Sequence, residues 1–318
     1  QLRSKFMNKL KKVGLTALAT TLVASSAYAG ELSVSGSASL NYSGISTSSG
    51  ANPWTMGDSV TFSGGGDLDN GMTVGVSYEL DGGNYDDYKL TLGLGDDLGT
   101  ITFSGNSVNA GGVDTVKDMV PTAYTPVYEL ANETTGAADN GLATTSGRIT
   151  TSMWGYAINM SGFDVSLGYN QKPAAGAEAE TSIGVKYADL MDGLTIGAGR
   201  MDDGDVAESD TVGVSYTAGS ITAAYQITKV DYEATGTADQ DAVHYGVSVA
   251  VNENLSVSAG RMAVDITDAA DDEINTGMSA SYTMGSIAIK GAFNQVDSAS
   301  GVVNRDAEST SLNISFAF

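Results

Sequence analysis

The chain has 318 residues, with 15 lysines and arginines against 38 aspartates and glutamates, and a formal net charge of −23. This acidic balance argues against nucleic acid as a partner, because nucleic-acid binding requires clustered basic residues. No cysteine occurs, so disulfides and thiolate metal sites are excluded. Forty glycines and only four prolines are typical of an all-β protein with tight turns.

The first 29 residues have the pattern of an export signal. Gln1 to Phe6 precede the first methionine, so we expect translation to start at Met7. A basic stretch, an apolar run from Val13 to Ala24 and a final Ala-Tyr-Ala follow, the order of a secretory signal peptide with its cleavage site. We therefore predict two parts: 1–29, upstream residues plus signal peptide, and 30–318, one domain. The removed part holds five basic and no acidic residues, which leaves a net charge of −28.

From residue 30 onward, apolar and polar residues alternate in stretches of about ten, the period of an extended strand with one apolar face. The first stretch is Glu31 to Tyr42. Four more follow before residue 106, with the apolar residues Val60 and Phe62; Met72, Val74, Val76, Tyr78 and Leu80; Leu90, Leu92 and Leu94; and Ile101 and Phe103. Residues 106–147 then show no sustained period.

Alternation resumes at residue 154 and continues as five hairpins. Their apolar residues are Trp154, Tyr156, Ile158 and Met160 with Phe163, Val165, Leu167 and Tyr169; Ile183, Val185 and Tyr187 with Leu194, Ile196 and Ala198; Val212, Val214 and Tyr216 with Ile221, Ala223, Tyr225 and Ile227; Val243, Tyr245, Val247 and Val249 with Leu255, Val257 and Ala259; and Met278, Ala280 and Tyr282 with Ile287, Ile289 and Phe293. Three of the tyrosines, Tyr187, Tyr216 and Tyr282, immediately precede short turns, as in an aromatic girdle at a membrane interface.

The last stretch, Ser309 to Phe318, places Leu312, Ile314, Phe316 and Phe318 on one face. It brings the predicted number of strands to sixteen, and single-chain bacterial barrels have an even number. An alternating terminal strand that ends in phenylalanine resembles the closing strand of Gram-negative outer-membrane β-barrels. That resemblance implies that these four residues form the signal read by the barrel-assembly machinery.

The connections support a closed barrel. All four prolines fall between the predicted strands, and short turns alternate with long polar loops. A soluble sandwich seldom has sixteen strands in one sheet, and a solenoid would keep a fixed repeat length. We therefore predict a 16-stranded antiparallel transmembrane β-barrel, whose closure pairs every backbone group within lipid.

Catalytic and metal-binding chemistry is poorly supported. The one histidine, His244, lies between outward residues, so we expect a solvated side chain in the lumen and no enzymatic activity. The acidic segments 201–210 and 265–273 do not match a twelve-residue calcium loop, which favours solvated loops and no cofactor. Calcium or magnesium shared with lipopolysaccharide phosphates stays open, since carboxylates suit these cations.

The long segment 106–147 follows the fifth predicted strand, and connections of this length tend to be functional. A long third loop in such a barrel resembles the general porins of Gram-negative outer membranes, most closely the alphaproteobacterial type. The resemblance implies a homotrimer in which the third loop folds inward and narrows the channel. In this chain the loop carries one lysine, Lys117, and five acids that would form the constriction: Asp114, Asp118, Glu129, Glu133 and Asp139. Four apolar residues would hold a helical turn against the wall: Val113, Val116, Met119 and Val120.

Lys89, Lys186 and Lys290 lie between outward apolar residues and so are predicted to face the lumen, opposite the loop acids. The alternative is an extracellular loop with no role in the pore. The direction of three arginines at strand ends stays open: Arg148, Arg200 and Arg261. The second loop, 81–87, is short, whereas family members use it to latch onto a neighbouring subunit.

The sequence thus predicts a passive, cation-preferring diffusion pore for small hydrophilic solutes, with outer-membrane lipid and lipopolysaccharide around it. The alternative from another class is a structural or adhesive barrel with a blocked lumen.

Overall fold

A computed structural model describes residues 32–46, 52–82, 84–95, 97–105, 111–131, 153–171, 178–204, 206–233 and 235–318. The predicted signal peptide lies outside these residues. In the described part, no helix combines the length and the hydropathy required to cross a membrane.

The predicted sixteen strands are confirmed. They are β1 Ser33–Ile45, β2 Trp54–Asp67, β3 Thr73–Asp81, β4 Asn84–Gly93, β5 Thr100–Gly105, β6 Met153–Met160, β7 Phe163–Asn170, β8 Glu180–Tyr187, β9 Leu194–Asp202, β10 Ala207–Ala218, β11 Ile221–Tyr232, β12 Gln240–Ala250, β13 Leu255–Ile266, β14 Glu273–Met284, β15 Ile287–Asp297 and β16 Ala307–Ala317. The 3-10 helices η1 Gly112–Thr115 and η4 Ala299–Gly301 lie in connections. The first strand continues to Ile45, three residues beyond the predicted end.

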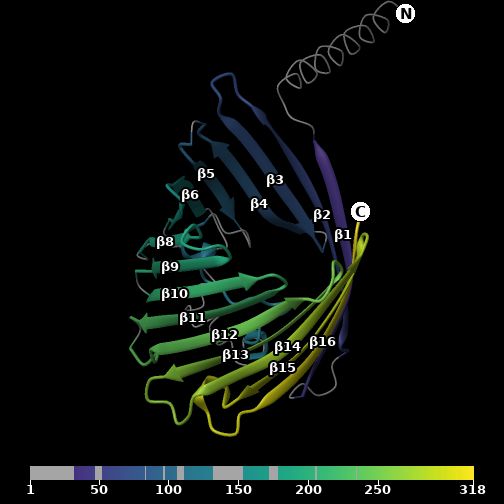
Figure 1. The fold of residues 1–318 in the computed structure, drawn as a ribbon, viewed down its shortest axis with the longest axis vertical. Coiled ribbons are helices and arrows are strands. Elements are labelled where there is room, and N and C mark those ends of the chain that lie inside the picture. The colour runs from purple at the N-terminus through teal and green to yellow at the C-terminus, as the bar shows by residue number, and fades with distance from the viewer. Residues whose placement is uncertain are drawn as a thin grey trace, which may run out of the picture.

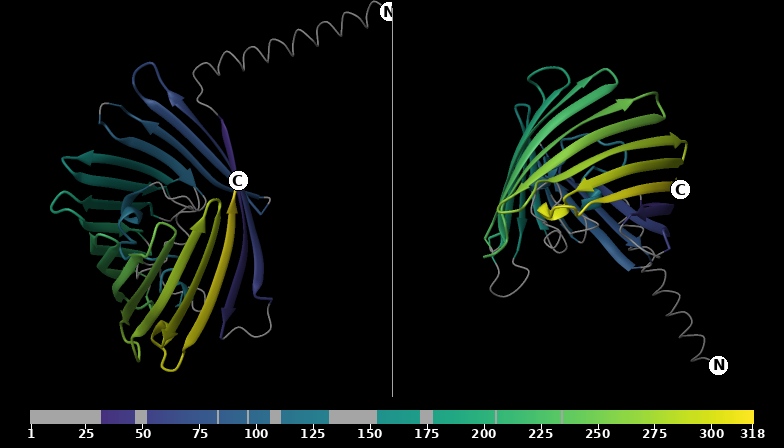
Figure 2. Two further views of the ribbon diagram at one scale, coloured as in Figure 1. Left: turned by 45° about the vertical axis from the view of Figure 1, so that its right-hand side comes forward. Right: turned by 90° about the horizontal axis from the view of Figure 1, so that it is seen from below.

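Each strand pairs antiparallel with its neighbour in the chain, and β16 pairs with β1 to close a single barrel. Figure 1 shows this wall running from β1 through the green strands to β16, and Figure 2 shows β16 lying beside β1. The closing register sets Leu40 opposite Ile314. Closure leaves no strand edge exposed, so every strand finds its hydrogen-bonding partners inside the sheet.

The two faces of the wall differ in the way that the alternation predicts. On β10 and β11, Val214 pairs with Tyr225, and both side chains point outward and are about 40% exposed (38% and 43%). The neighbouring pair, Gly213 and Gln226, occupies the inner face, and the Gln226 side chain is buried. The apolar face of each strand therefore lies on the outside of the barrel and the polar face on the inside, as a membrane-embedded barrel requires.

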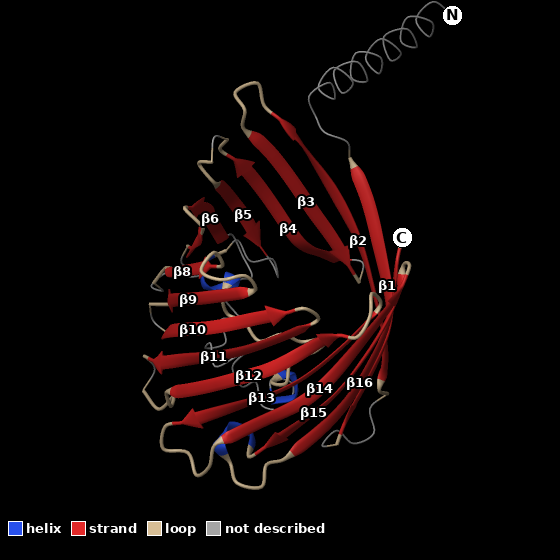
Figure 3. Cartoon of the chain, viewed as in Figure 1, coloured by secondary structure: helices blue, strands red, loops and turns tan. Residues whose placement is uncertain are grey.

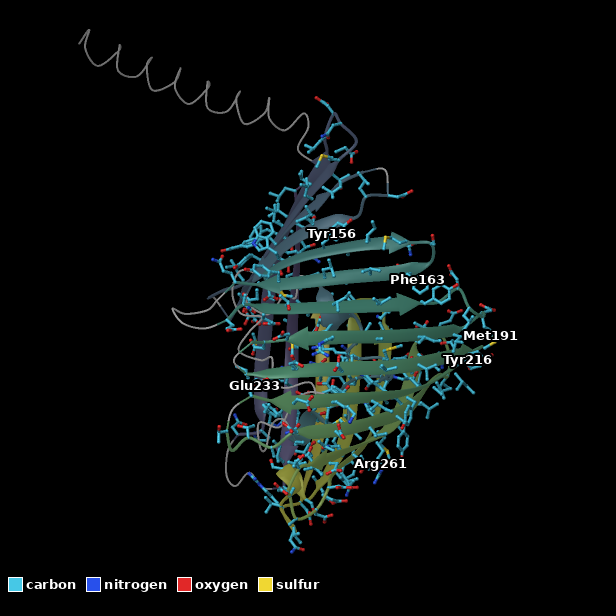
Figure 4. All side chains as sticks on the ribbon, turned by 90° about the vertical axis from the view of Figure 1, so that its left-hand side faces the viewer. Tyr156, Phe163, Met191, Tyr216, Glu233 and Arg261 are labelled. Carbon is cyan, nitrogen blue, oxygen red and sulfur yellow. The ribbon has the colours of Figure 1, made fainter. Side chains whose placement is uncertain are left out.

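Aromatic side chains gather at the end of the barrel that carries the short turns. Phe163 and Tyr187 stack with ring centroids 4.4 Å apart, and Tyr216 and Tyr282 are exposed on the outer face. Figure 4 shows Phe163 and Tyr216 at one end of the strands and Glu233 at the other. This arrangement places an amphipathic band of rings where a membrane interface would lie.

The opposite end, where the long loops 267–272 and 298–306 lie, has charged residues on the outer face. Arg200 forms ion pairs with Glu208 and Asp210, and the Lys229 ammonium lies 3.1 Å from Asp241 Oδ2. The pairing register connects these residues across β9 to β12 in one row, since Asp210 is opposite both Arg200 and Lys229. The row marks the limit of the outer apolar band at the long-loop end of the barrel.

The sequence left the direction of the strand-end arginines open, and the register decides it for two of them. Arg200 pairs with Ile183, and Arg261 pairs with Tyr245, which are outward residues. Both arginines therefore lie on the outer face and do not line the channel. Arg148 lies outside the described residues.

Removal of Phe318 is expected to impair barrel assembly. The Gly36 N–H donates to the Phe318 carbonyl (2.8 Å) and the Phe318 N–H donates to the Gly36 carbonyl (2.9 Å), so the last residue contributes two hydrogen bonds to closure. The measurement is the yield of assembled protein in the outer membrane. Phe163→Leu changes an aromatic residue at the same end without touching the closing strands and should assemble better. Equal yields would contradict a specific role for Phe318.

An arginine should be tolerated on the inner face of β10 but not on the outer face. Val214→Arg places a charge in the apolar band and should cost about 2 to 4 kcal/mol if this position lies at the membrane midplane. The matched variant Ser215→Arg places the same side chain in the lumen and should fold normally. Urea unfolding in lipid vesicles measures both. Equal destabilisation would show that the two faces are assigned incorrectly.

Candidate functional site

Residues 111–131, here called the inner loop, run inside the barrel along its wall. Near the start of the loop, the Gly112 N–H donates to Ser166 Oγ on β7 (2.8 Å). Near its end, the Pro126 carbonyl accepts from Asn294 Nδ2 on β15 (3.1 Å). Figure 3 shows the helical turn η1 on the inner side of β8. From Gly112 to Pro126 the loop therefore follows about half of the barrel circumference, and the predicted inward fold of the third loop is confirmed.

Glycines on the inner face of the wall make room for the loop. A Cβ built on Gly197 or Gly213, which pair directly on β9 and β10, would lie 2.5 or 2.7 Å from Met119 Sδ. On β12, a Cβ at Gly246 would lie 2.8 Å from Val120. Such distances are shorter than van der Waals contact, so a larger residue at these positions would have to move the Met119 or Val120 side chain. The glycines form a track that the sequence pattern alone did not reveal.

Apolar side chains fix both ends of the inner loop. At the first end, Val113 and Val116 pack with Met201 of β9 in a buried cluster. At the second end, Leu130 and Ala131 are 1% exposed and pack in a cluster with wall and outer-loop residues: Val296, Ala299, Ala307 and Ile45. All four residues that the sequence singled out for this packing are buried: Val113, Val116, Met119 and Val120. Burial of these side chains at both ends holds the inner loop against the wall.

Between the two ends, Gln226 of β11 binds the loop backbone. Its Nε2 donates to the Lys117 carbonyl (2.5 Å) and its Oε1 accepts from the Met119 N–H (3.0 Å). A second donor contact reaches Thr211 Oγ1 (2.9 Å), so the amide is fixed from both sides. Gln226 therefore satisfies two loop backbone groups that are buried against the wall. Sequence reasoning missed it, because a lumen-facing glutamine has no distinguishing pattern.

The inner loop carries a compact group of charges. Lys117 Nζ lies 2.9 Å from Asp114 Oδ1 and 3.9 Å from Asp118 Oδ2, and Tyr128 Oη donates to Asp118 Oδ1 (2.9 Å). The Asp118 side chain is half exposed (50%), whereas those of Asp114 and Lys117 are less exposed (29% and 25%). Two carboxylates thus surround a single ammonium group in this part of the loop. Glu129 is partly buried in the same loop.

The three predicted wall lysines occupy inner positions on different strands: Lys89 on β4, Lys186 on β8 and Lys290 on β15. Lys290 Nζ lies 5.8 Å from the centre of the Tyr124 ring of the inner loop. None of these three ammonium groups lies within 4.0 Å of a described carboxylate of the loop. The structure thus separates wall lysines from loop acids. Glu133 and Asp139 lie outside the described residues.

A sequence-family model described as Gram-negative porin matches residues 14–277. The chain belongs to the Gram-negative porin family. The family and the fold are those of non-enzymatic channels, and they place this porin in the bacterial outer membrane as a general pore.

Solved structures share the fold of this porin at low sequence identity. A loop L8 deletion mutant of OmpT, an outer-membrane protein of Vibrio cholerae, has 14% identity and a TM-score of 0.68, with 91% of this chain and 99% of that chain covered. A mutant porin of Rh. blastica has 16% identity and a TM-score of 0.62, covering 91% and 100%. A porin structure refined at 1.8 Å resolution has 17% identity and a TM-score of 0.65, with the same coverage. A search of curated protein sequences found no match.

The expectation of a solvated His244 is wrong. This residue of β12 is 6% exposed and packs edge-on against Tyr128 of the inner loop, with ring centroids 5.8 Å apart. Pairing sets it beside Gln226 on the inner face. The inward direction of the His244 side chain was predicted correctly, but sequence reasoning could not anticipate that the inner loop covers this part of the wall. Among the described residues, no group of three or more histidines and carboxylates is arranged to hold a metal ion.

Replacing Gln226 should release the loop while leaving the barrel intact. Gln226→Leu leaves the Lys117 carbonyl and the Met119 N–H without their wall partner, at a cost of about 1 to 3 kcal/mol for each buried group. Hydrogen exchange at the Met119 amide should accelerate. Gln295→Leu, which removes an exposed outward contact to Glu308, is the matched control and should leave this exchange unchanged. Unchanged exchange in Gln226→Leu would show that this side chain does not hold the loop.

Proposed function

We propose that this porin is a passive, water-filled diffusion pore for small hydrophilic solutes and ions, with a preference for cations. The observation that carries the proposal is the position of the inner loop. Its described contacts fall on β7 to β16 and on Ile45 of β1, so it lines more than half of the wall. A loop held in this way narrows a channel to a fixed cross-section, which a blocked adhesive barrel would not require.

Towards the short-turn end, the wall on β1 and β16 beyond the loop contacts at Ile45 and Ala307 is polar and suits water. The inner face of β1 and β16 consists mainly of serine and asparagine: Ser33, Ser35, Ser37, Ser39, Asn41 and Ser43, with Ser309, Ser311, Asn313 and Ser315. Some of these groups bond to each other, as where Asn313 Nδ2 donates to Asn41 Oδ1 (2.6 Å). Short neutral side chains leave space for solutes and hold none of them strongly.

The preference for cations rests on carboxylates that face the channel. Asp114 and Asp118 outnumber Lys117 at the start of the inner loop, and Glu79 and Asp81 lie at inner positions of β3. A carboxylate in a narrow channel with low-dielectric walls raises the local concentration of cations. The wall lysines oppose this field, but they are distributed over β4, β8 and β15. Carboxylates at the narrowest point should therefore dominate.

The assembly and the lipid contacts belong to the same proposal. A homotrimer is expected from the family resemblance, although β3 ends at Asp81 and β4 begins at Asn84, which leaves a very short second loop as a latch. The outward charged row that contains Arg200 and Lys229 lies at the level expected for lipopolysaccharide headgroups. Calcium or magnesium bound jointly by outer-loop carboxylates and lipid phosphates would strengthen that contact.

Neutralising the inner loop should weaken the selectivity for cations. The triple variant Asp114→Asn, Asp118→Asn and Glu129→Gln leaves Lys117 as the charged group of the described loop. We expect the reversal potential in a potassium chloride gradient, measured in a planar bilayer, to shift towards the anion value.

The matched control neutralises three exposed carboxylates on the outer face: Asp231, Asp265 and Asp297. Charges beyond about 8 Å from the constriction are screened at physiological salt, so this variant should shift the reversal potential less. Equal shifts, or a wild type that prefers anions, would contradict the loop as the selectivity determinant. A wild type without conductance would favour the blocked barrel.

A further inference from the structure

A cavity of about 710 Å³ lies at the short-turn end of β5 to β8, directly beside the inner loop. Thr115 of the loop forms one side of it, and the turns around Asp97 and Ser161 form another. The groups that carry charge or donate hydrogen bonds come from three further positions on β6 to β8: Asn159, Asp164 and Lys186. Asp164, Ser166 and Lys186 of its lining lie on the inner face of the wall, so the cavity adjoins the path of a solute that moves from the constriction towards the short turns.

The cavity holds charges of both signs that form no ion pair with one another. Asp164 and Lys186 lie directly opposite on β7 and β8, and both face the lumen. No described carboxylate, including that of Asp164, lies within 4.0 Å of the Lys186 ammonium. Asp164 Oδ1 instead accepts a hydrogen bond from Asn159 Nδ2 (2.7 Å). Lys186 therefore presents an ammonium group to the cavity beside a carboxylate that is already oriented.

This charge pattern selects a ligand by chemical class. The two carboxylates, Asp97 and Asp164, repel a simple anion, and Lys186 opposes a simple cation beside Asp164. A solute with an ammonium and a carboxylate group satisfies both signs at once. Side chains directly opposite on neighbouring strands have Cβ atoms about 4.5 to 5.5 Å apart, a spacing that a small amino acid can bridge. We propose that the cavity is a low-affinity subsite for small zwitterionic solutes of the amino-acid class.

The subsite is coupled to the constriction through shared residues. Ser166, which lines the cavity, accepts the hydrogen bond from the Gly112 N–H that anchors the start of the inner loop. Thr115, which also lines it, donates to the Gly112 carbonyl (2.8 Å). A solute in the cavity therefore lies against the turn that bounds the channel. Its occupancy should lower the ion current and should concentrate zwitterions at the exit of the pore.

The inference rests on the proposed diffusion function, and single-channel recording of the purified porin in a planar bilayer tests both. Alanine, added in excess to a potassium chloride solution, should reduce the current in a saturable manner. Propionate lacks the ammonium group and ethylammonium lacks the carboxylate, and neither should do so at the same concentration. This comparison uses the wild-type protein alone. An equal effect of propionate or ethylammonium would overturn selection for zwitterions.

Two variants then assign the effect to the cavity. Lys186→Gln and Asp164→Asn should each raise the alanine concentration for half-maximal block about tenfold, as expected when one charge-assisted contact is lost. Lys290→Gln, a lumen lysine outside the cavity, is the control and should leave the block unchanged. Normal conductance without alanine block, or an equal loss in Lys290→Gln, would overturn the subsite alone. Absence of conductance in the wild type would overturn the proposed function.

Discussion

The structure depends first on the pairing of backbone groups within a membrane. Hydrocarbon offers no hydrogen bonds, so a sheet that crosses it must close on itself. Closure here is the pairing of β1 with β16, and it reaches the last residue, where Gly36 and Phe318 exchange two hydrogen bonds. Once the wall is closed, alternation assigns each side chain to lipid or lumen. Closure of the barrel, together with alternation, therefore decides which side chains line the lumen.

The inner loop is the second constraint, because it must lie against this wall without filling the channel. Glycines at Gly197, Gly213 and Gly246 let loop side chains approach the sheet backbone, and Gln226 occupies the corresponding place on β11 with two hydrogen bonds to the loop. The loop thus has both steric space and polar partners. Glycine weakens an isolated strand, but in a closed barrel each strand is supported on both sides, so the wall can accommodate this track.

The electrostatic effect of a charged residue in the lumen depends more on its distance from other charged residues than on how many of them the sequence contains. The sequence shows an acidic loop with a single lysine, yet that lysine lies beside Asp114 and Asp118, so the local charge is smaller than the composition implies. Lys186, by contrast, lies away from the loop acids and beside a cavity. The two lysines therefore have different electrostatic environments: Lys117 lies beside the carboxylates of the constriction, and Lys186 is available to a solute.

The sequence by itself determined the barrel, because a period of two along each strand and the alternation of short and long connections are local properties. It also indicated the outward girdle at Tyr216 and Tyr282 and the apolar residues that fix the loop. Only the tertiary structure decided what depends on contacts between distant segments. The burial of His244 under Tyr128, the glycine track and the cavity at Lys186 arise where the wall meets the inner loop, and the outward direction of Arg200 and Arg261 required knowing where each strand ends. A pattern within one strand carries no information about such neighbours.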